Sequence, residues 1–484
     1  MNMKKLISMV LALVMLLAMS TTAMAETYTI SAPDNGHIYE VYQIFTGELF
    51  DGVLSNICWG KNGTGVLNEE VSDEILEEIE DVNGNDKTDT EKLAVILKYA
   101  QLNAENKFGV ATSEAALKNV PAGYYLIKDV DGAFEDEYDS YTTYVVKVVS
   151  NVTISPKSSV PEVEKKVDDK NDSNTKEDGE NWQDSADYDI GDEVPFKLTA
   201  TLGDNLTGYE TYKIVFHDTL SAGLTYYKNT EDTTDTKNYK VTIDGVDVTE
   251  KFVDSYSGTN LTFTCDDVLE LGAEEGSEIV VEYFATLNKN AVIGAAGNPN
   301  EVYLEFTNNP NTETETGKTP SDKVIVFTYK VIVNKVDENN QELAKAGFTL
   351  YKKNASGEYV AVGNELKGDQ MTQFVWEGLD DGDYKLSETT TPPGYNTIED
   401  IEFTISAEHD EKADAPALTK LKGGDLFTGN VSTGALTGDV VNEKGATLPE
   451  TGAQGTKMIY IAGGILVAAA VILLITKRRM NSAE

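Results

Sequence analysis

Apolar and polar residues alternate along most of the chain, and this is the period of a half-buried β-strand. Residues 38–45 predict a buried strand, and residues 123–127 and 141–149 predict two more. Between the first and the second of these strands, apolar positions recur every three or four residues, as in helices with one buried face. The two predicted helical stretches place on their buried faces first Val71, Ile75, Leu76 and Ile79, and then Leu93, Ile96, Leu97 and Ala100.

The rest of the chain up to about residue 445 shows the strand period without a sustained helical one. Residues 194–198 and 213–216 predict two strands, and residues 331–337 predict the first strand of a further series. We expect residues 308–317 to form a polar loop, because another strand is predicted at residues 324–329.

These elements predict three domains after a leader of residues 1–25. Residues 26–157 form a strand-rich domain with a helical insertion, and a Pro- and Ser-rich joint at residues 155–161 separates it from the next. Residues 158–328 and 329–447 each form a string of short strands. The predicted fold class is therefore mainly β, with tandem immunoglobulin-like β-sandwich domains, the first carrying the helical insertion.

The N-terminal residues 1–25 have the three parts of a signal peptide. Lys4 and Lys5 form a basic start, an apolar run follows at residues 6–19, and Ala23-Met24-Ala25 is a small-residue cleavage site. We expect cleavage after Ala25 and export of the chain. The alternative is an uncleaved N-terminal anchor.

The C-terminal residues 448–484 carry a second targeting signal. Its order is a pentapeptide, an apolar run at residues 458–475 long enough for a membrane-spanning helix, and a basic tail. This order resembles the cell-wall sorting signal read by sortases, which implies cleavage after Thr451 and transfer of its carbonyl to an amine. The alternative is a single-pass membrane protein. The pentapeptide comprises Leu448, Pro449, Glu450, Thr451 and Gly452, and the tail contains Lys477, Arg478 and Arg479.

Composition narrows the function classes. The 82 acidic and 39 basic side chains give a formal charge of −43, which argues against nucleic acid and anionic lipid as partners.

The two cysteines, Cys58 and Cys265, are expected to be two buried thiols, and the alternative is an inter-domain disulfide. The three histidines are far apart in sequence, and no metal-ligand cluster, phosphate loop or nucleophile–histidine pairing stands out. We expect no cofactor, no metal and no enzymatic turnover, although a glycosidase-type carboxylate pair is not excluded.

The candidate chemistry lies in residues 329–447. Lys335 shares one strand face with Val331 and Val333, and Glu388 shares another with Tyr384 and Leu386. An inward lysine or glutamate costs several kcal/mol if it stays unpaired. Either the two form a buried ion pair or lie on a solvated face, or a neutral Lys335 attacks the carboxamide of Asn442 with Glu388 as the acid.

This region resembles a collagen-adhesin B-type domain. The matching features, in order, are Lys335-Val336-Asp337, the Ala-Gly-Phe-Thr-Leu of residues 346–350, the Gly-Asp-Tyr-Lys-Leu-Ser-Glu of residues 382–388, and the terminal Asn442. Such domains form Lys–Asn isopeptide bonds. The resemblance implies that Lys335 supplies the amine, Asn442 the amide and Glu388 the acid.

Residues 158–328 carry a similar set of a lysine, an aspartate and an asparagine. This region resembles the middle domain of Gram-positive major pilins. The resemblance implies a second isopeptide bond, for which the candidates are Lys165, Asn300 and the acid Asp218. Lys166 and Asn308 remain competitors, since Asn300 and Asn308 have the same parity on the predicted strand.

The resemblance to major pilins covers nearly the whole chain. Their shaft lysine lies in a Tyr-Pro-Lys motif, and here the corresponding residues are Ser155-Pro156-Lys157, so Lys157 is the expected acceptor of the Thr451 acyl group. The resemblance implies a structural shaft subunit of a covalent surface pilus at the cell wall. Its partners would be class C and housekeeping sortases, identical subunits, minor pilins, peptidoglycan and a host surface. The alternative is a monomeric wall-anchored adhesin that does not polymerise.

Overall fold

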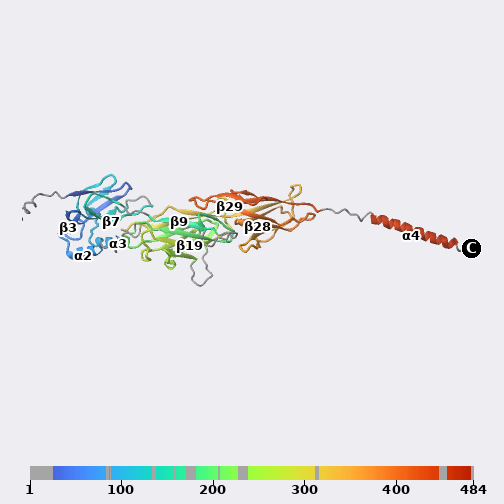
Figure 1. Cartoon of the computed structure of the whole chain (residues 1–484), viewed down its shortest axis with the longest axis horizontal. Coiled ribbons are helices and arrows are strands. Elements are labelled where there is room, and N and C mark those ends of the chain that lie inside the picture. The colour runs from blue at the N-terminus through green and yellow to red at the C-terminus, as the bar shows by residue number, and fades with distance from the viewer. Residues whose placement is uncertain are drawn as a thin grey trace, which may run out of the picture.

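The computed structural model describes residues 26–82, 87, 89–132, 138–155, 160–169, 181–204, 206, 208–226, 238–310, 315–445 and 455–480. Its strand-rich parts follow one another along a single long axis in chain order (Figure 1). The predicted signal peptide, Pro156, Lys157 and the pentapeptide Leu448 to Gly452 lie outside the described residues. We refer to the sheets of residues 27–153, 162–327 and 329–442 as the first, second and third units; the domain boundaries predicted from the sequence stay predictions.

The first unit contains two sheets and two helices. A five-stranded sheet has the order β3-β2-β6-β7 with β4 beside β2, and a three-stranded sheet has the order β5-β1-β8. Both predicted helices are present but shorter than their apolar patterns, since Val71 and Ala100 lie outside them. The bounds are β1 Thr27–Ser31, β2 Ile38–Phe50, β3 Val53–Trp59, α2 Asp73–Val82, α3 Asp89–Leu97, the 3₁₀ turn η1 Ala104–Asn106, β4 Gly109–Thr112, β5 Leu117–Pro121, β6 Gly123–Asp129, β7 Thr143–Val148 and β8 Val152–Thr153.

The second unit is a sandwich of two seven-stranded sheets. One sheet has the order β10-β9-β12-β19-β15-β16 with β14 beside β19, and the other β11-β22-β20-β13-β18-β17 with β21 beside β20. Inward side chains of both sheets form one core. The bounds are β9 Glu162–Asp168, β10 Trp182–Gln183, β11 Ser185–Asp187, β12 Glu193–Thr201, β13 Ile214–Leu220, β14 Leu224–Tyr226, β15 Tyr239–Ile243, β16 Val246–Asp247, η2 Thr249–Lys251, β17 Val253–Ser257, β18 Asn260–Cys265, β19 Glu278–Leu287, β20 Asn298–Thr307, β21 Thr316–Lys318 and β22 Asp322–Phe327.

The third unit is a smaller sandwich with its own core. A four-stranded sheet has the order β27-β23-β32-β31 and a six-stranded sheet the order β25-β24-β28-β29-β30 with β26 beside β24. Its first and last strands, β23 and β32, are parallel neighbours. The bounds are β23 Tyr329–Asp337, β24 Gly347–Lys353, β25 Tyr359–Ala361, β26 Leu366–Lys367, β27 Gln373–Leu379, β28 Gly382–Thr390, β29 Ile401–His409, β30 Leu418–Lys422, β31 Thr428–Asn430 and β32 Ala435–Asn442.

These sheets confirm the mainly β fold class with tandem sandwiches, and they correct two local expectations. The predicted loop at residues 308–317 is too long, because the short strand β21 begins at Thr316 and pairs with β20. Both cysteines are free thiols, but Cys265 is buried whereas Cys58 is only half-buried. The expectation of two buried thiols is therefore wrong for Cys58.

The C-terminal helix α4, Gly455–Met480, covers the predicted apolar run. Among the residues that the structure describes, no helix meets the combined requirement of length and apolarity for crossing a membrane. The membrane-spanning helix at residues 458–475 stays a prediction.

Candidate functional site

Lys165 lies at the centre of the second unit and is fully buried. It is on β9, where alternate residues point into the core, and it pairs across the sheet with Leu198 of β12. Its side chain crosses the sandwich to the facing sheet, where Nζ lies 2.5 Å from Oδ2 of Asp218 on β13. Both side chains have no solvent exposure.

Asn300 lies beside Asp218 on the same face of that facing sheet. In the β13–β20 pairing Asp218 is opposite Val302 and Leu220 is opposite Asn300, so the two polar residues are diagonal neighbours. Asn300 is also fully buried. The structure therefore brings the three sequence-predicted residues of this unit together.

A fourth residue, Tyr283 on β19, joins the three. Its hydroxyl donates to Asp218 Oδ2 over 2.6 Å, and it accepts from Asn300 Nδ2 at 2.7 Å and from Lys165 Nζ at 3.2 Å. Sequence reasoning missed Tyr283. Alternation along β19 could have placed it inward, but only the strand order of the sheet, with β12 between β9 and β19, brings it near this lysine.

Burial shapes the protonation of this cluster. It lowers the pKa of Lys165, although the charge of Asp218 opposes the shift. It raises the pKa of Asp218, against the opposing effects of Lys165 and Tyr283. Asp218 Oδ1 and Asn300 Oδ1 are buried without a hydrogen-bond partner among the described residues. The cluster thus favours a neutral amine beside a neutral acid more than an exposed pair would.

The two competing residues lie elsewhere. Lys166 points to the other side of β9, where Nζ lies 2.6 Å from Asp184 Oδ1 and 2.9 Å from Glu164 Oε1. Asn308 lies just beyond β20 and donates through Nδ2 to the Asp139 carbonyl of the first unit, over 3.3 Å. Neither of them contacts the Lys165 cluster through these bonds.

In the third unit, Lys335 is fully buried on β23. Its Nζ donates to the backbone carbonyls of Val336 and Val440, each at 2.9 Å. Burial lowers the pKa of Lys335 to about 8, although the nearby charges of Glu388 and Asp337 oppose this. A substantial fraction of this amine is therefore neutral near pH 8.

Asn442 and Glu388 lie against each other in the same core. Lys335 pairs with Val440 across the parallel strands, so Asn442 is its diagonal neighbour on the same face. Asn442 Nδ2 donates to Glu388 Oε1 at 3.0 Å, to Oε2 at 3.1 Å and to the Asn396 carbonyl at 2.8 Å. Its Oδ1 is buried without a hydrogen-bond partner within the described part of the chain.

Both sites hold the groups needed for an amide exchange. A neutral lysine amine can attack a carboxamide carbon, and a neutral acid can polarise the carbonyl and carry protons to the leaving ammonia. The acid contacts the amine in the second unit and the amide in the third. The remaining predicted site residues, Lys157 and the pentapeptide, fall in segments that the structure does not describe.

Three family models match successive parts of the chain. Residues 190–310 match the Gram-positive pilin backbone subunit 2, Cna-B-like domain, residues 329–416 match a prealbumin-like fold domain, and residues 440–482 match the LPXTG cell wall anchor motif. The chain is therefore a cell-wall-anchored surface protein built from pilin-type modules.

Its relatives narrow this class. The chain is 25% identical over 397 residues to the trypsin-resistant surface T6 protein of Streptococcus pyogenes, covering 67% of this chain and 70% of that one. It is 31% identical over 122 residues to the fimbrial subunit type 1 of Actinomyces viscosus, covering 25% of this chain and 18% of that one. A solved structure of the T6 backbone pilin of Streptococcus pyogenes is similar in fold, with a TM-score of 0.50, 18% identity and coverage of 87% and 98%. The pilin-type modules, the anchor motif and the similarity to backbone pilins therefore support a pilus shaft subunit that is anchored to the cell wall.

Proposed function

We propose that this protein is polymerised by a sortase that joins the Thr451 carbonyl of one subunit to the Lys157 amine of the next. A class C sortase would build the polymer, with minor pilins as partners, and a housekeeping sortase would attach it to peptidoglycan. The second and third units would each carry an internal isopeptide bond, Lys165–Asn300 and Lys335–Asn442. In this role the chain is a substrate and building block, without enzymatic turnover.

The observation that carries the proposal is the buried contact of Lys165 with Asp218, next to Asn300. An ion pair without solvent exposure loses more hydration energy than its attraction readily returns. As an ion pair it also leaves Asp218 Oδ1 and Asn300 Oδ1 without partners. Bond formation would remove the amine charge and let a protonated Asp218 donate to the new amide carbonyl.

The reaction balances without a cofactor. The neutral Lys165 Nζ attacks the side-chain carbonyl carbon of Asn300, and Asp218 donates a proton to the carbonyl oxygen. Asp218 then moves a proton from Nζ to the departing nitrogen. The C–Nδ2 bond breaks, ammonia leaves, and the re-formed carbonyl returns its proton to Asp218. Lys335, Asn442 and Glu388 would follow the same steps.

The intact mass of the exported part of the chain, residues 26–451, tests the internal bonds. Each bond expels one ammonia, so two bonds give a deficit of about 34 Da from the sequence mass. Asp218→Ala and Glu388→Ala should each halve the deficit, after correction for the substitution. Lys166→Ala is the matched control and should leave the whole deficit. A full-length mass without any deficit would rule out both bonds.

Polymerisation is tested separately in a cell that expresses a class C pilus sortase. The natural chain should give a ladder of covalent multimers, and Lys157→Ala should leave monomers while the subunits still fold. Lys367→Ala, which removes a largely exposed lysine of the third unit, should keep the ladder. A ladder that survives Lys157→Ala would place the acceptor on another lysine. Monomers from the natural chain would favour the non-polymerising adhesin.

A further inference from the structure

Three carboxylates meet where the second unit adjoins the third. Asp187 ends β11, and Asp380 and Asp381 form the turn between β27 and β28. One oxygen from each lies within 4.8 Å of those of the other two. Asp187 is 2% exposed and Asp380 1% exposed, so this is a buried acidic cluster rather than a solvated face. Uncompensated, such an arrangement is strongly unfavourable.

The charge around the cluster is only partly balanced by protein groups. Lys352 contacts Asp189 and also Asp380, the latter at 3.3 Å. Asp187 Oδ2 and Asp381 Oδ1 are nevertheless buried without a hydrogen-bond partner of good geometry among the described residues. The Tyr329 hydroxyl lies beside Asp187 and interacts with its carboxylate. Both oxygens keep lone pairs for a further partner, which is a property of a site that takes a ligand.

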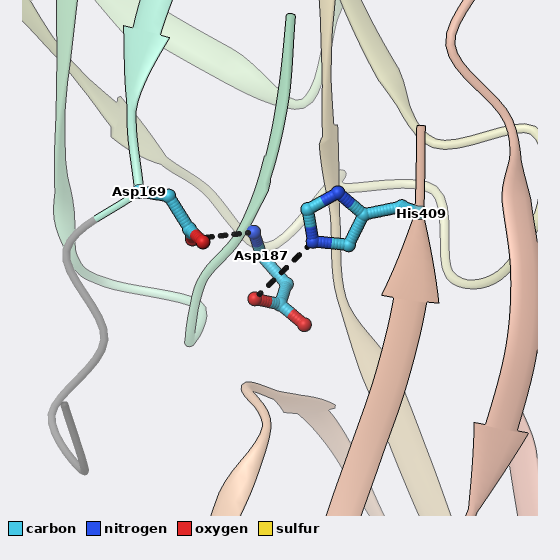
Figure 2. Close-up of side chains that lie close together, drawn as sticks. All are labelled: Asp169, Asp187 and His409. Atoms are coloured by element: carbon cyan, nitrogen blue, oxygen red, sulfur yellow. Dashed lines mark hydrogen bonds and ion pairs between the residues drawn. The ribbon is translucent and has the colours of Figure 1, made fainter. Parts of the chain in front are cut away.

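Neighbouring groups hold Asp187 in place from the other side. Its backbone N–H donates to Asp169 Oδ1 over 3.4 Å, and its Oδ1 lies 4.0 Å from Nε2 of His409 (Figure 2). The other ring nitrogen of His409 is 2.7 Å from the Ser185 hydroxyl. In Figure 2 the contact with His409 reaches only one of the two carboxylate oxygens of Asp187. These contacts position the backbone of Asp187 and engage one of its carboxylate oxygens, so the second oxygen is left for another partner.

We propose that Asp187, Asp380 and Asp381 bind a calcium ion that connects the second and third units. Three carboxylates are a hard, all-oxygen ligand set, which suits Ca²⁺ better than a transition metal. Asp169 and His409 form an alternative set with Asp187. However, Asp169 already accepts from Gln183 Nε2 at 2.9 Å and from the Asp187 amide, so it acts as an orienting group.

The bound ion would reinforce direct contacts at the same place. The Asp380 N–H donates to Asp189 Oδ1 at 2.8 Å, and the Ile190 N–H donates to the Gly378 carbonyl at 2.9 Å. Calcium would add a link between β11 and the β27–β28 turn and neutralise the repulsion among the carboxylates. The junction between the two units would then be stiffer with calcium than without it. This inference does not depend on polymerisation or on the isopeptide bonds.

Calorimetric titration of calcium into chelator-treated protein, residues 26–451, tests the site. We expect one ion per chain with a dissociation constant of about 10⁻⁴–10⁻³ M, as for extracellular calcium modules. Asp187→Asn and Asp381→Asn should abolish binding in that range and the calcium-dependent rise of the melting temperature. Asp369→Asn removes an exposed carboxylate of the same unit and is the matched control, which should bind like the natural chain.

Three results would overturn the proposal. One is no binding heat up to roughly 10 mM calcium, about tenfold above the weakest expected affinity. Another is unchanged binding in Asp381→Asn, which decides the matter even if the more buried Asp187→Asn fails to fold. The third is magnesium binding as tight as calcium binding, which would contradict the choice of ion.

Discussion

Lys165 and Lys335 are both fully buried, yet their amines have different neighbours. Lys165 Nζ contacts a carboxylate and a phenol, whereas Lys335 Nζ donates to two backbone carbonyls. Carbonyls accept hydrogen bonds from either protonation state, but a carboxylate favours the charged amine. Proton transfer from Lys165 to Asp218 is therefore the step on which the site in the second unit depends, and the Tyr283 hydroxyl bonds to both groups.

Tyr283→Phe should slow the formation of the Lys165–Asn300 bond by roughly tenfold, because it removes one hydrogen bond to each reacting group. The measurement is intact mass against time after refolding of the newly made chain. The third-unit bond should form at its normal rate in the same molecule. Tyr226→Phe is the control, since Tyr226 packs on Tyr283 with ring centroids 5.9 Å apart but bonds to Asp254. Equal rates for both variants would reduce Tyr283 to a packing role.

His37 gives the first unit a pH dependence. Burial alone would lower its pKa, but hydrogen bonds to Asp129 and Asp139 outweigh burial and raise the pKa to about 9. A raised pKa stabilises the fold fully below the unfolded value of about 6.5, and the stabilisation disappears as pH rises through about 9. We expect a loss of about 2 kcal/mol across this window, after allowing for the partial exposure of Asp139.

Denaturant unfolding at pH 6 to 9.5, followed by a first-unit probe such as Trp59 fluorescence, measures this loss. His37→Gln keeps a neutral donor and acceptor but cannot take up the proton, so its stability should be nearly flat over the window. A slope in His37→Gln as steep as in the natural chain would show that another group titrates.

At the scale of the elements, the alternation of apolar and polar residues predicted the strands well. The helical period predicted both helices of the first unit but not their bounds. The first helix is shorter than its pattern because the Val71 N–H bonds to the Ile57 carbonyl and Val71 packs beside the sheet. The second ends before Ala100, which forms a bridge with Gly63. An apolar residue next to a helix continues its period whether or not its backbone is helical.

Strand period also limits what could be predicted of the sites. It places Asn300 and Asn308 on the same face but does not say which lies near Asp218, because that depends on the register between β13 and β20. The acidic cluster of Asp187, Asp380 and Asp381 was not predicted for the same reason. Asp187 is distant in sequence from Asp380 and Asp381, and only the packing of two units brings it to them. Whether the isopeptide bonds form stays a prediction.

Two glycines lie where a loop of the second unit contacts a loop of the third unit. Gly294 and Gly434 have φ of +89° and +62°, and a Cβ on Gly434 would lie 2.6 Å from the Gly294 nitrogen. Gly434→Ala should therefore cost more than the strain of a left-handed alanine, at least about 2 kcal/mol. Gly357→Ala, with φ of +80° and open space around the new Cβ, should cost about 1 kcal/mol. Thermal unfolding of the two variants compares them, and equal losses would argue against a tight junction.

At the scale of the whole molecule, the units lie in a row (Figure 1), and the proposed bonds determine which residues carry tension. A pull between Lys157 and Thr451 would pass from Lys165 directly to Asn300, and from Lys335 directly to Asn442. Most of the second and third units would lie outside this path, and so would the first unit, which precedes Lys157. Tension would be concentrated on the segment that contains β22, the junction and the start of β23.

Single-molecule stretching between residues 157 and 451 tests this arrangement. The natural chain should show no unfolding step from the third unit, because the Lys335–Asn442 bond bridges its ends. Glu388→Ala should release the chain between these residues as one step of roughly 350 Å, at about 3.3–3.6 Å per residue. Asp218→Ala is the matched comparison, since it should release a step from the second unit and leave the third closed. A third-unit step in the natural chain would mean that the covalent bridge is absent, and the buried Lys335 would then act only as a hydrogen-bonded core residue.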